Sequence, residues 1–189
     1  TYSCINCQRT LPYLNAWWDK YKDAGLLIIG VHTPEFDFEK DYGNVLKAIE
    51  KYGVKYPVVQ DNDYQTWLAY KNRYWPRKYL IDIDGYVVYD HIGEGRYEET
   101  EKKIQELLEE REEVLKLNEN LDKTLVEPDA EAARPFKAGT PEIYFGLLFS
   151  RKQFGNPEGW QADKTIRYAY PEILKRDLFY LNGDWKTNP

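Results

Sequence analysis

An unbroken apolar run, Leu26-Leu27-Ile28-Ile29-Gly30-Val31, follows a stretch near the start of the chain whose apolar residues have helical spacing. Such a run is typical of a central parallel strand that is covered on both faces. Parallel strands are joined by long crossover connections, which are usually helices. The segment therefore predicts an α/β fold built in layers.

Helix and strand patterns alternate along the sequence that follows. Asp84-Gly85 separates two apolar stretches and favours the tight turn of an antiparallel hairpin. A last helix begins near Tyr97, carries apolar residues as far as Leu121 and becomes a long, charged extension. After the first strand, the expected order is helix 38–52, strand 57–59, helix 64–70, paired strands 79–82 and 86–92, and this last helix. The order predicts an α/β/α architecture with a mixed sheet over residues 1–121.

Cys4-Ile5-Asn6-Cys7 contains the only two cysteines of the chain, and helix-forming residues follow at once. A dithiol with this spacing can close to a disulfide with little backbone movement. At the start of a helix, unpaired N–H groups and the helix dipole stabilise the thiolate of the outer cysteine. We therefore predict thiol–disulfide exchange, with Cys4 as the nucleophile and Cys7 as the shielded residue that attacks second.

Other interpretations of the two cysteines stay open. A zinc site needs about four ligands, and only His32 and His91 could add to the pair; we expect no metal. A static disulfide would make the chain a binding or scaffold protein, although so short a loop constrains the unfolded chain little. The Thr1-x-x-Cys4 pattern also fits a peroxidatic cysteine, which makes peroxidase activity a minor alternative.

The position of Cys4 raises a question about the sheet. Ligand chemistry in α/β folds lies at the carboxyl ends of strands, so a strand should lead directly into Cys4. Only three residues precede it, and the sequence contains no methionine. We expect that a strand immediately upstream belongs to the domain, and that a signal peptide or anchor precedes it in the unprocessed protein.

Several segments together resemble the TlpA/ResA-like branch of the thioredoxin superfamily, and within it the redoxin part of DipZ-type proteins. The resemblance covers about residues 1–112. The segments that carry it are Thr1-Tyr2-Ser3-Cys4-Ile5-Asn6-Cys7, Leu11-Pro12-Tyr13-Leu14, Gly30-Val31-His32-Thr33-Pro34-Glu35-Phe36, Tyr56-Pro57-Val58-Val59-Gln60-Asp61 and Arg73-Tyr74-Trp75-Pro76-Arg77-Lys78-Tyr79-Leu80-Ile81-Asp82. It implies a thioredoxin-like fold and a redox-active Cys4–Cys7 disulfide, with no other cofactor.

The resemblance also implies roles for individual residues. Pro76 matches the cis-proline that packs beside the dithiol in this family, which would leave the backbone of Trp75 free to pair with an extended substrate. Glu35 matches an acidic residue that can exchange a proton with the inner cysteine. Ordinary loop and core positions are the alternatives for these three residues. Substrate contacts are further expected from the residues around the dithiol, Tyr2, Ile5 and Asn6.

Relatives of this kind imply a location and a partner. The redoxin part of DipZ-type proteins commonly follows a CcdA-like membrane electron carrier and faces the outside of the cytoplasmic membrane. We therefore expect an extracytoplasmic protein, tethered to the membrane in its full-length form, that exchanges protein thiols and disulfides. The chain as printed has no apolar run long enough to span a bilayer.

The composition of the C-terminal part differs from that of the first. Residues 122–141 are rich in proline and alanine, which indicates a linker, and residues 142–189 are rich in aromatic side chains. The second segment resembles the start of the β-rich, carbohydrate-binding-like module of DipZ-type proteins, and it is too short to be a complete one. Trp160 and Trp185 would stack on sugars if exposed, or serve as packing residues if buried.

The charge of the chain gives no sign of a nucleic-acid partner. The net charge is −6, and residues 98–119 alone carry nine acidic and four basic side chains. This concentration indicates a solvated helix face more readily than an acidic docking surface. No basic stripe suited to nucleic acid occurs.

Overall fold

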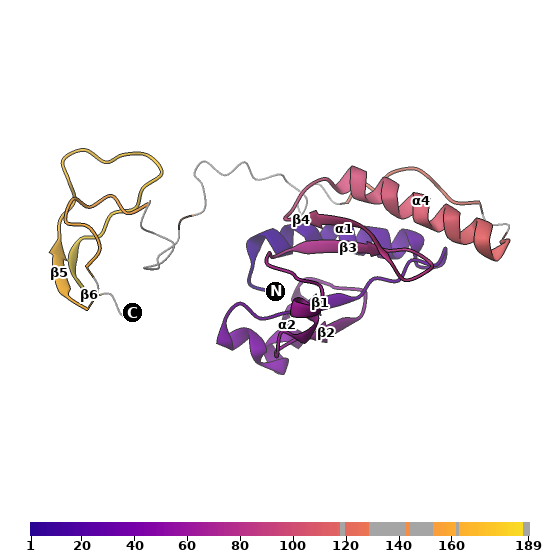
Figure 1. The fold of residues 1–189 in the computed structure, drawn as a ribbon, viewed down its shortest axis with the longest axis horizontal. Coiled ribbons are helices and arrows are strands. Elements are labelled where there is room, and N and C mark those ends of the chain that lie inside the picture. The colour runs from indigo at the N-terminus through magenta and orange to yellow at the C-terminus, as the bar shows by residue number, and fades with distance from the viewer. Residues whose placement is uncertain (118–119, 129–142, 144–152, 162, 187–189) are drawn as a thin grey trace. The chain divides into compact units, whose positions relative to one another are not determined.

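The computed structural model describes residues 1–117, 120–128, 143, 153–161 and 163–186. The chain divides into two compact units, residues 1–134 and 135–189, which are described separately. The first unit contains nearly all of the regular structure and both cysteines. Helices and strands alternate in it as the sequence predicts, and Figure 1 shows their arrangement.

The first unit begins with helix α1, Ile5–Tyr21, and continues through short elements. These are β1 (Gly30–His32), the 3-10 helix η1 (Asp37–Lys40), α2 (Tyr42–Lys51), β2 (Val58–Gln60), α3 (Gln65–Ala69), β3 (Arg77–Ile81), β4 (Val87–Ile92) and α4 (Tyr97–Leu115). The helix expected over 38–52 is divided into η1 and α2. Asp41 lies between them and caps α2, because its carboxylate accepts a hydrogen bond of 2.8 Å from the backbone of Asn44.

The strands form two pairs. β1 and β2 are parallel, with Gly30 opposite Val58, and β3 and β4 are antiparallel, with Arg77 opposite Ile92. In the described part of the chain these pairs are separate two-stranded sheets, in place of the single mixed sheet expected. The hairpin between β3 and β4 turns at Gly85, whose φ of 89° suits glycine.

The prediction that Leu26–Val31 is buried on both faces was wrong. Leu26 and Ile28 pack against the core, whereas the alternate residues Leu27, Ile29 and Val31 are 66%, 53% and 42% exposed. Only the end of the run, from Gly30, pairs as a strand. Alternating burial is what an extended segment shows when one of its faces lacks a covering layer.

The core of the first unit lies between α1 and α4. Its buried members are Trp17, Tyr21, Ile104 and Leu108. The spacing of these residues places each pair on one face of its helix. α4 ends at Leu115, earlier than predicted, because Lys116 adopts a left-handed conformation with φ 54°.

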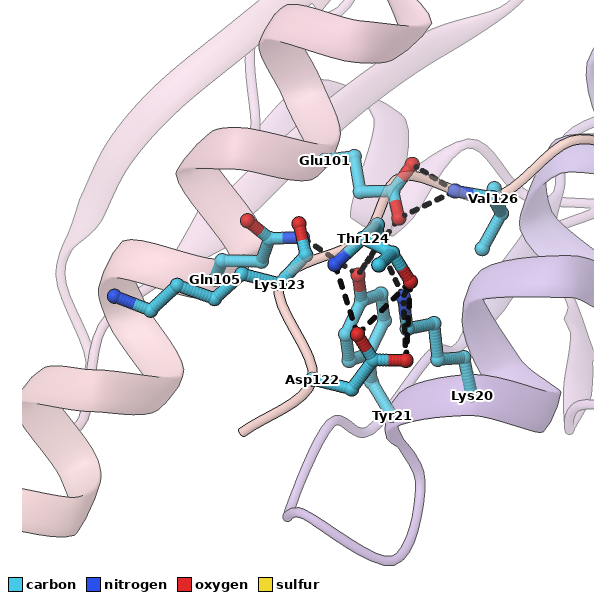
Figure 2. Close-up of polar contacts among 8 residues, drawn as sticks. All are labelled: Lys20, Tyr21, Glu101, Gln105, Asp122, Lys123, Thr124 and Val126. Atoms are coloured by element: carbon cyan, nitrogen blue, oxygen red, sulfur yellow. Dashed lines mark hydrogen bonds and ion pairs between the residues drawn. The ribbon is translucent and has the colours of Figure 1, made fainter. Parts of the chain in front are cut away.

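The chain then returns along the helices instead of continuing outward. Leu121 and Val126 pack against the same core. The carboxylate of Glu101 accepts hydrogen bonds from the Tyr21 hydroxyl (2.7 Å) and the Val126 backbone (2.9 Å), as Figure 2 shows. The start of the expected linker 122–141 is thus part of the first unit, and its residues 129–141 lie outside the described ranges.

The second unit has a small core of its own. Strands β5, Thr165–Tyr168, and β6, Gly183–Lys186, pair antiparallel. Tyr168, Phe179 and Leu181 are buried, and Trp160 packs against them. Asn156 crosslinks this unit, since its side-chain amide donates to Ala169 and Leu181 carbonyls and accepts from the Leu181 backbone. Trp160 therefore packs its indole against this core, whereas the indole of Trp185 is exposed.

Among the helices described, none combines the length and the apolar character needed to cross a bilayer.

Candidate active site

The N-terminus of α1 positions the two cysteines. Cys4 is the N-cap residue, with extended backbone angles, and the helix begins at Ile5. Cys7 follows one turn into the helix, and both sulfur atoms are thiols of intermediate exposure. The backbone N–H groups of Asn6 and Cys7, which have no partner within the helix, are directed to the Cys4 sulfur.

The two thiols have opposite acidities. A hydrogen bond from the Cys7 thiol and the two backbone N–H groups lower the pKa of Cys4 to about 6, against the effect of partial burial. The pKa of Cys7 is raised far above its usual value, because its thiol donates to Cys4 and because it is more deeply buried. At neutral pH the site therefore holds one thiolate, on Cys4, and one thiol, on Cys7.

The loop before β3 lies against Cys4. The peptide bond between Trp75 and Pro76 is cis, as the resemblance implied. The carbonyl oxygen of Trp75 lies 3.9 Å from Cys4 Sγ. Two contacts hold the Trp75 ring in place. Its Nε1 donates a hydrogen bond of 3.1 Å to the Thr33 carbonyl, and its ring centroid lies 4.2 Å from that of Trp67. The structure thus brings the loop and the dithiol together.

A buried glutamate anchors the segment just before Cys4. The carboxylate of Glu39 accepts hydrogen bonds from the Ser3 hydroxyl (2.6 Å), the Glu35 backbone (2.6 Å) and the Phe36 backbone (3.0 Å). Its side chain is fully buried. Burial alone would raise the pKa of Glu39, but these hydrogen bonds lower it to about 2.

Glu39 was not among the predicted site residues. A glutamate within a charged, helix-like stretch is usually solvated, so this stretch gave no reason to place Glu39 in the site. Its position three residues after Phe36, at the start of a helical turn, is the signal that could have identified it. The predicted acid, Glu35, has an exposed side chain and takes part in this cluster through its backbone.

The residues expected to contact substrate surround Cys4. Ile5 is exposed directly after it. The carbonyl of Asn6 accepts a hydrogen bond from Thr10 inside α1. The ring of Tyr2 stacks on His32, with centroids 5.5 Å apart, and its hydroxyl donates to the Phe38 carbonyl. Ile5 and Tyr2 are thus at the surface or edge of the site, and the Asn6 backbone is part of the helix.

Three further buried titratable side chains lie around the dithiol or the residues just before it, and none of them was among the predicted site residues. His32 is buried, and burial lowers its pKa. Burial also lowers the pKa of Lys78 to about 8, and its Nζ donates to the Gly93 carbonyl at 3.1 Å. Tyr56 is buried as well, which raises its pKa. Cys7 acts electrostatically on both Lys78 and Tyr56, so they belong to its surroundings.

Within the described ranges, no group of three or more His, Cys, Asp and Glu side chains is arranged to hold a metal ion.

A C-x-x-C dithiol at the start of a helix, in an α/β domain with a proline loop against the outer sulfur, defines a thioredoxin-like redoxin. Residues 1–90 match the AhpC/TSA family. This part of the chain has a thioredoxin-like fold and is similar to proteins named as thiol-disulfide oxidoreductases.

The similarity to one relative extends beyond this domain. The chain is 42% identical over 184 residues to protein DipZ of Mycobacterium bovis, which covers 97% of this chain and 26% of DipZ. It is 28% identical over 110 residues to the thiol-disulfide oxidoreductase YkuV of Bacillus subtilis, covering 58% of this chain and 74% of YkuV. The chain therefore spans about a quarter of the length of DipZ.

A solved structure supports the fold. A Chlorobium tepidum protein assigned as the thiol:disulfide interchange protein DsbE superposes with a TM-score of 0.52 and 26% identity. The superposition covers 57% of this chain and 74% of the other. It confirms the thioredoxin-like fold of the first unit.

Proposed function

We propose that the protein is a thiol–disulfide oxidoreductase that acts on protein disulfides through Cys4 and Cys7. The observation that carries this proposal is the division of acidity between the two sulfur atoms, with Cys4 as a thiolate and Cys7 as a thiol near neutral pH. The names of the similar proteins support it, since YkuV and ResA are both called thiol-disulfide oxidoreductases.

The reaction has two exchange steps. The Cys4 thiolate attacks one sulfur of a substrate disulfide, so that a mixed disulfide forms and the other substrate sulfur leaves as a thiolate. Cys7 then loses its proton and attacks Cys4, which forms the Cys4–Cys7 disulfide and releases the second substrate thiolate. The substrate has gained two electrons, and the protein has lost two. The reverse sequence oxidises a substrate dithiol.

The loop at Trp75 and Pro76 would bind the substrate backbone. The Trp75 carbonyl already lies beside Cys4 Sγ, so an extended segment that carries the target cysteine can pair with this loop as a short strand. Pairing through the backbone gives affinity with little sequence selectivity. Proton transfer to and from Cys7 by Glu35 stays a prediction, and exchange of Glu35 for glutamine should slow the second step if it is correct.

Location and electron supply extend the same proposal. Relatives such as DipZ are much longer than this chain, and we propose that the protein works outside the cytoplasmic membrane, tethered to it. There a CcdA-like membrane carrier would supply the electrons. Glycan binding by the second unit is a weaker proposal, because Trp160 is used in packing and Trp185 alone of the two is exposed.

Two cysteine variants test the exchange mechanism. Cys7→Ser should accumulate a mixed disulfide with a substrate protein, whereas Cys4→Ser should form none and should lose insulin reduction. Retained insulin reduction in Cys4→Ser would refute the assigned nucleophile. A pair that never cycles in glutathione or dithiothreitol buffers would leave a scaffold with a static disulfide.

The reduction potential of the pair then gives the direction of electron flow. A value near about −250 mV or below would identify a reductant, and one near about −120 mV an oxidant.

A further inference from the structure

A buried lysine, Lys78, lies on the face of β3 that α1 and α4 cover. Alternate residues of a strand point to the same face of its sheet, so Lys78 shares this face with Leu80, which packs against the core between the two helices. Lys78 is only 8% exposed, and lysine is almost never buried to this extent unless its charge has a partner. The two exchange steps described for Cys4 and Cys7 do not use it.

Two contacts hold the ammonium group of Lys78 in place. Its Nζ donates a hydrogen bond of 3.1 Å to the Gly93 carbonyl and lies over the Tyr97 ring, 5.5 Å from its centroid. Neither contact neutralises the positive charge. Glu94 is the carboxylate whose charge acts on Lys78, but it forms an ion pair of 3.4 Å with Arg9.

The contacts of Tyr97 connect this ammonium group to the face of α1 that carries Cys7. The Tyr97 ring stacks on Tyr13, with centroids 3.5 Å apart, and its hydroxyl lies 3.5 Å from the Thr10 hydroxyl. Thr10 follows Cys7 by three residues, and residues with this spacing are neighbours on one face of a helix. Cys7 and Lys78 therefore approach the same buried space, one from the helix and one from the strand, and both line one cavity.

The electrostatics agree with this placement. Burial lowers the pKa of Lys78 to about 8, and the charge of Cys7 acts on it in the opposite direction. Lys78 therefore stays an ammonium at neutral pH. Because the attraction between two opposite charges is mutual, the same ammonium favours the thiolate form of Cys7.

The second exchange step needs a charge of this kind. In the free dithiol, the hydrogen bond to Cys4 and burial both raise the pKa of Cys7. Once Cys4 is bonded to the substrate sulfur it is no longer a thiolate, so the first of these two effects ends. Burial remains, and it disfavours the thiolate that must attack. A positive charge in the same buried space offsets the effect of burial, because charges interact more strongly where water is excluded.

We propose that Lys78 is a positioning residue for the second exchange step, in which its ammonium favours the Cys7 thiolate that attacks the mixed disulfide. The role rests on the proposed function of the dithiol. The Cys7 proton leaves to solvent, Cys7 Sγ bonds to Cys4 Sγ, and the bond between Cys4 and the substrate sulfur breaks. The electron pair of that bond leaves with the substrate as a thiolate, and Lys78 keeps its proton throughout.

Other groups also influence the two residues. The further titratable or charged groups that face them are Cys4, Tyr13, Tyr56, Glu94, Tyr97 and the α-amino group of Thr1. A substitution at Lys78 leaves all of these groups in place. A change in the pH dependence of Cys7 in such a variant therefore reports the loss of the ammonium.

A coloured aromatic disulfide, dithiobis(nitrobenzoate), separates the two steps in one measurement. Attack by Cys4 releases one coloured thiolate, and attack by Cys7 on the resulting mixed disulfide releases the second. The reduced protein is mixed rapidly with an equimolar amount of the reagent over a range of pH. In Lys78→Met, the second phase should be about tenfold slower at pH 7, with its midpoint about one pH unit higher. The first phase should stay within about twofold of the unchanged protein, which also shows that the site is folded.

Two further variants identify the cause of the slower step. Lys78→Gln keeps a donor for the Gly93 carbonyl but loses the charge, so its second phase should be as slow as that of Lys78→Met. Lys102→Met removes an exposed ammonium on α4 that is paired with Glu98, and both of its phases should be unchanged. A normal second phase in Lys78→Gln, or a slow one in Lys78→Met with an unchanged midpoint, would overturn the proposal.

The unchanged protein distinguishes this role from the function on which it rests. Release of only one coloured thiolate would mean that the two cysteines do not exchange, and the proposed function would fail together with the role of Lys78. Release of two, with the same second phase and midpoint in Lys78→Met, would leave the exchange intact and refute the role of Lys78 alone.

Discussion

Cys4 and Cys7 lie one helical turn apart, yet their surroundings give them different chemistry. Cys4 receives hydrogen bonds from the Cys7 thiol and from backbone N–H groups, whereas Cys7 is more deeply buried. The acidity of Cys4 thus depends on its partner more than on any charged side chain. The Ile5-Asn6 spacer contributes no charge, and its contribution is the backbone N–H of Asn6.

The rate of alkylation of reduced Cys4 should follow this acidity. With iodoacetamide, the rate should rise with pH about a midpoint near 6, because only the thiolate reacts. In Cys7→Ala the main hydrogen bond to Cys4 is lost, and the midpoint should rise by about one unit. A midpoint near that of an ordinary thiol in the unchanged protein would contradict the assignment of Cys4 as the nucleophile.

Glu39→Gln should destabilise the first unit by about 2 kcal/mol at pH 7, because it weakens several hydrogen bonds to a buried carboxylate. The pKa of Glu39 in the folded protein is lowered from 4.5 to about 2. Its carboxylate therefore contributes stability above pH 4.5, and this contribution is lost as the pH falls towards 2. Urea unfolding at pH 7 and pH 3 should show a smaller loss on acidification in the variant.

Glu35→Gln is the matched control for this measurement, since its side chain is exposed. Its stability should stay within about 0.5 kcal/mol of the unchanged protein. Equal destabilisation by the two variants would show that burial of Glu39 is not what stabilises this segment.

The site could be predicted only in part from sequence. The dithiol was visible because cysteine spacing is a local signal, whereas the role of Pro76 was predicted only through the family resemblance. Glu39 and Lys78 were not visible, because a charged side chain is assumed to be solvated until the tertiary structure encloses it.

At the scale of elements, the return of the chain after α4 is held by buried polar contacts. Glu101 bonds to Tyr21 and to the Val126 backbone, and Gln105 donates to the same Tyr21 hydroxyl at 2.8 Å. Lys20 adds an ion pair of 3.3 Å with Asp122. The returning segment therefore covers the junction of α1 and α4 (Figure 2).

Glu101→Gln should cost about 1.5–3 kcal/mol, because a buried carboxylate with charge-assisted hydrogen bonds is replaced by a neutral group. The amide of Val126 should exchange faster by a larger factor than the core amides of α1. Glu106→Gln, on the same helix, removes an exposed ion pair with Lys103 and should cost less than about 0.5 kcal/mol. Similar losses of stability in both variants would mean that the hydrogen bonds between Glu101 and Val126 add no stability of their own.

The order of elements was largely predictable, and their partners were not. Helix periodicity located α1, α2 and the start of α4 within a few residues, and the Asp84-Gly85 turn located the hairpin between β3 and β4. The run Leu26–Val31 was misjudged as covered on both faces, because its apolar character does not reveal which neighbours lie beside it. The end of α4 was misplaced because Leu121 packs on the core from the returning segment.

At the scale of the whole molecule, the chain contains two units with separate cores. The second was predicted to be only the start of a β-rich module. In its described residues, Tyr168, Phe179 and Leu181 nevertheless form a buried core. Segments this short rarely form a core of their own. The side-chain amide of Asn156 helps this one to do so, because it donates hydrogen bonds to two separate parts of the unit.

Phe179→Ala should therefore unfold the second unit selectively. Loss of a buried aromatic ring costs about 3–5 kcal/mol, which is comparable to the whole stability of so small a core. Two-dimensional NMR spectra should lose the dispersed signals of β5 and β6, while the alkylation profile of Cys4 stays unchanged. A matching shift in the Cys4 profile would show that the two cores are coupled.

Every sulfur atom of the printed chain belongs to the Cys4–Cys7 dithiol, because this sequence has two cysteines and no methionine. The mass of the intact chain after treatment with a thiol-capping reagent is therefore a direct count of electrons stored at one place. Oxidative damage to methionine adds no background to that count. The capped mass therefore reports the redox state of the dithiol without a dye or an engineered reporter.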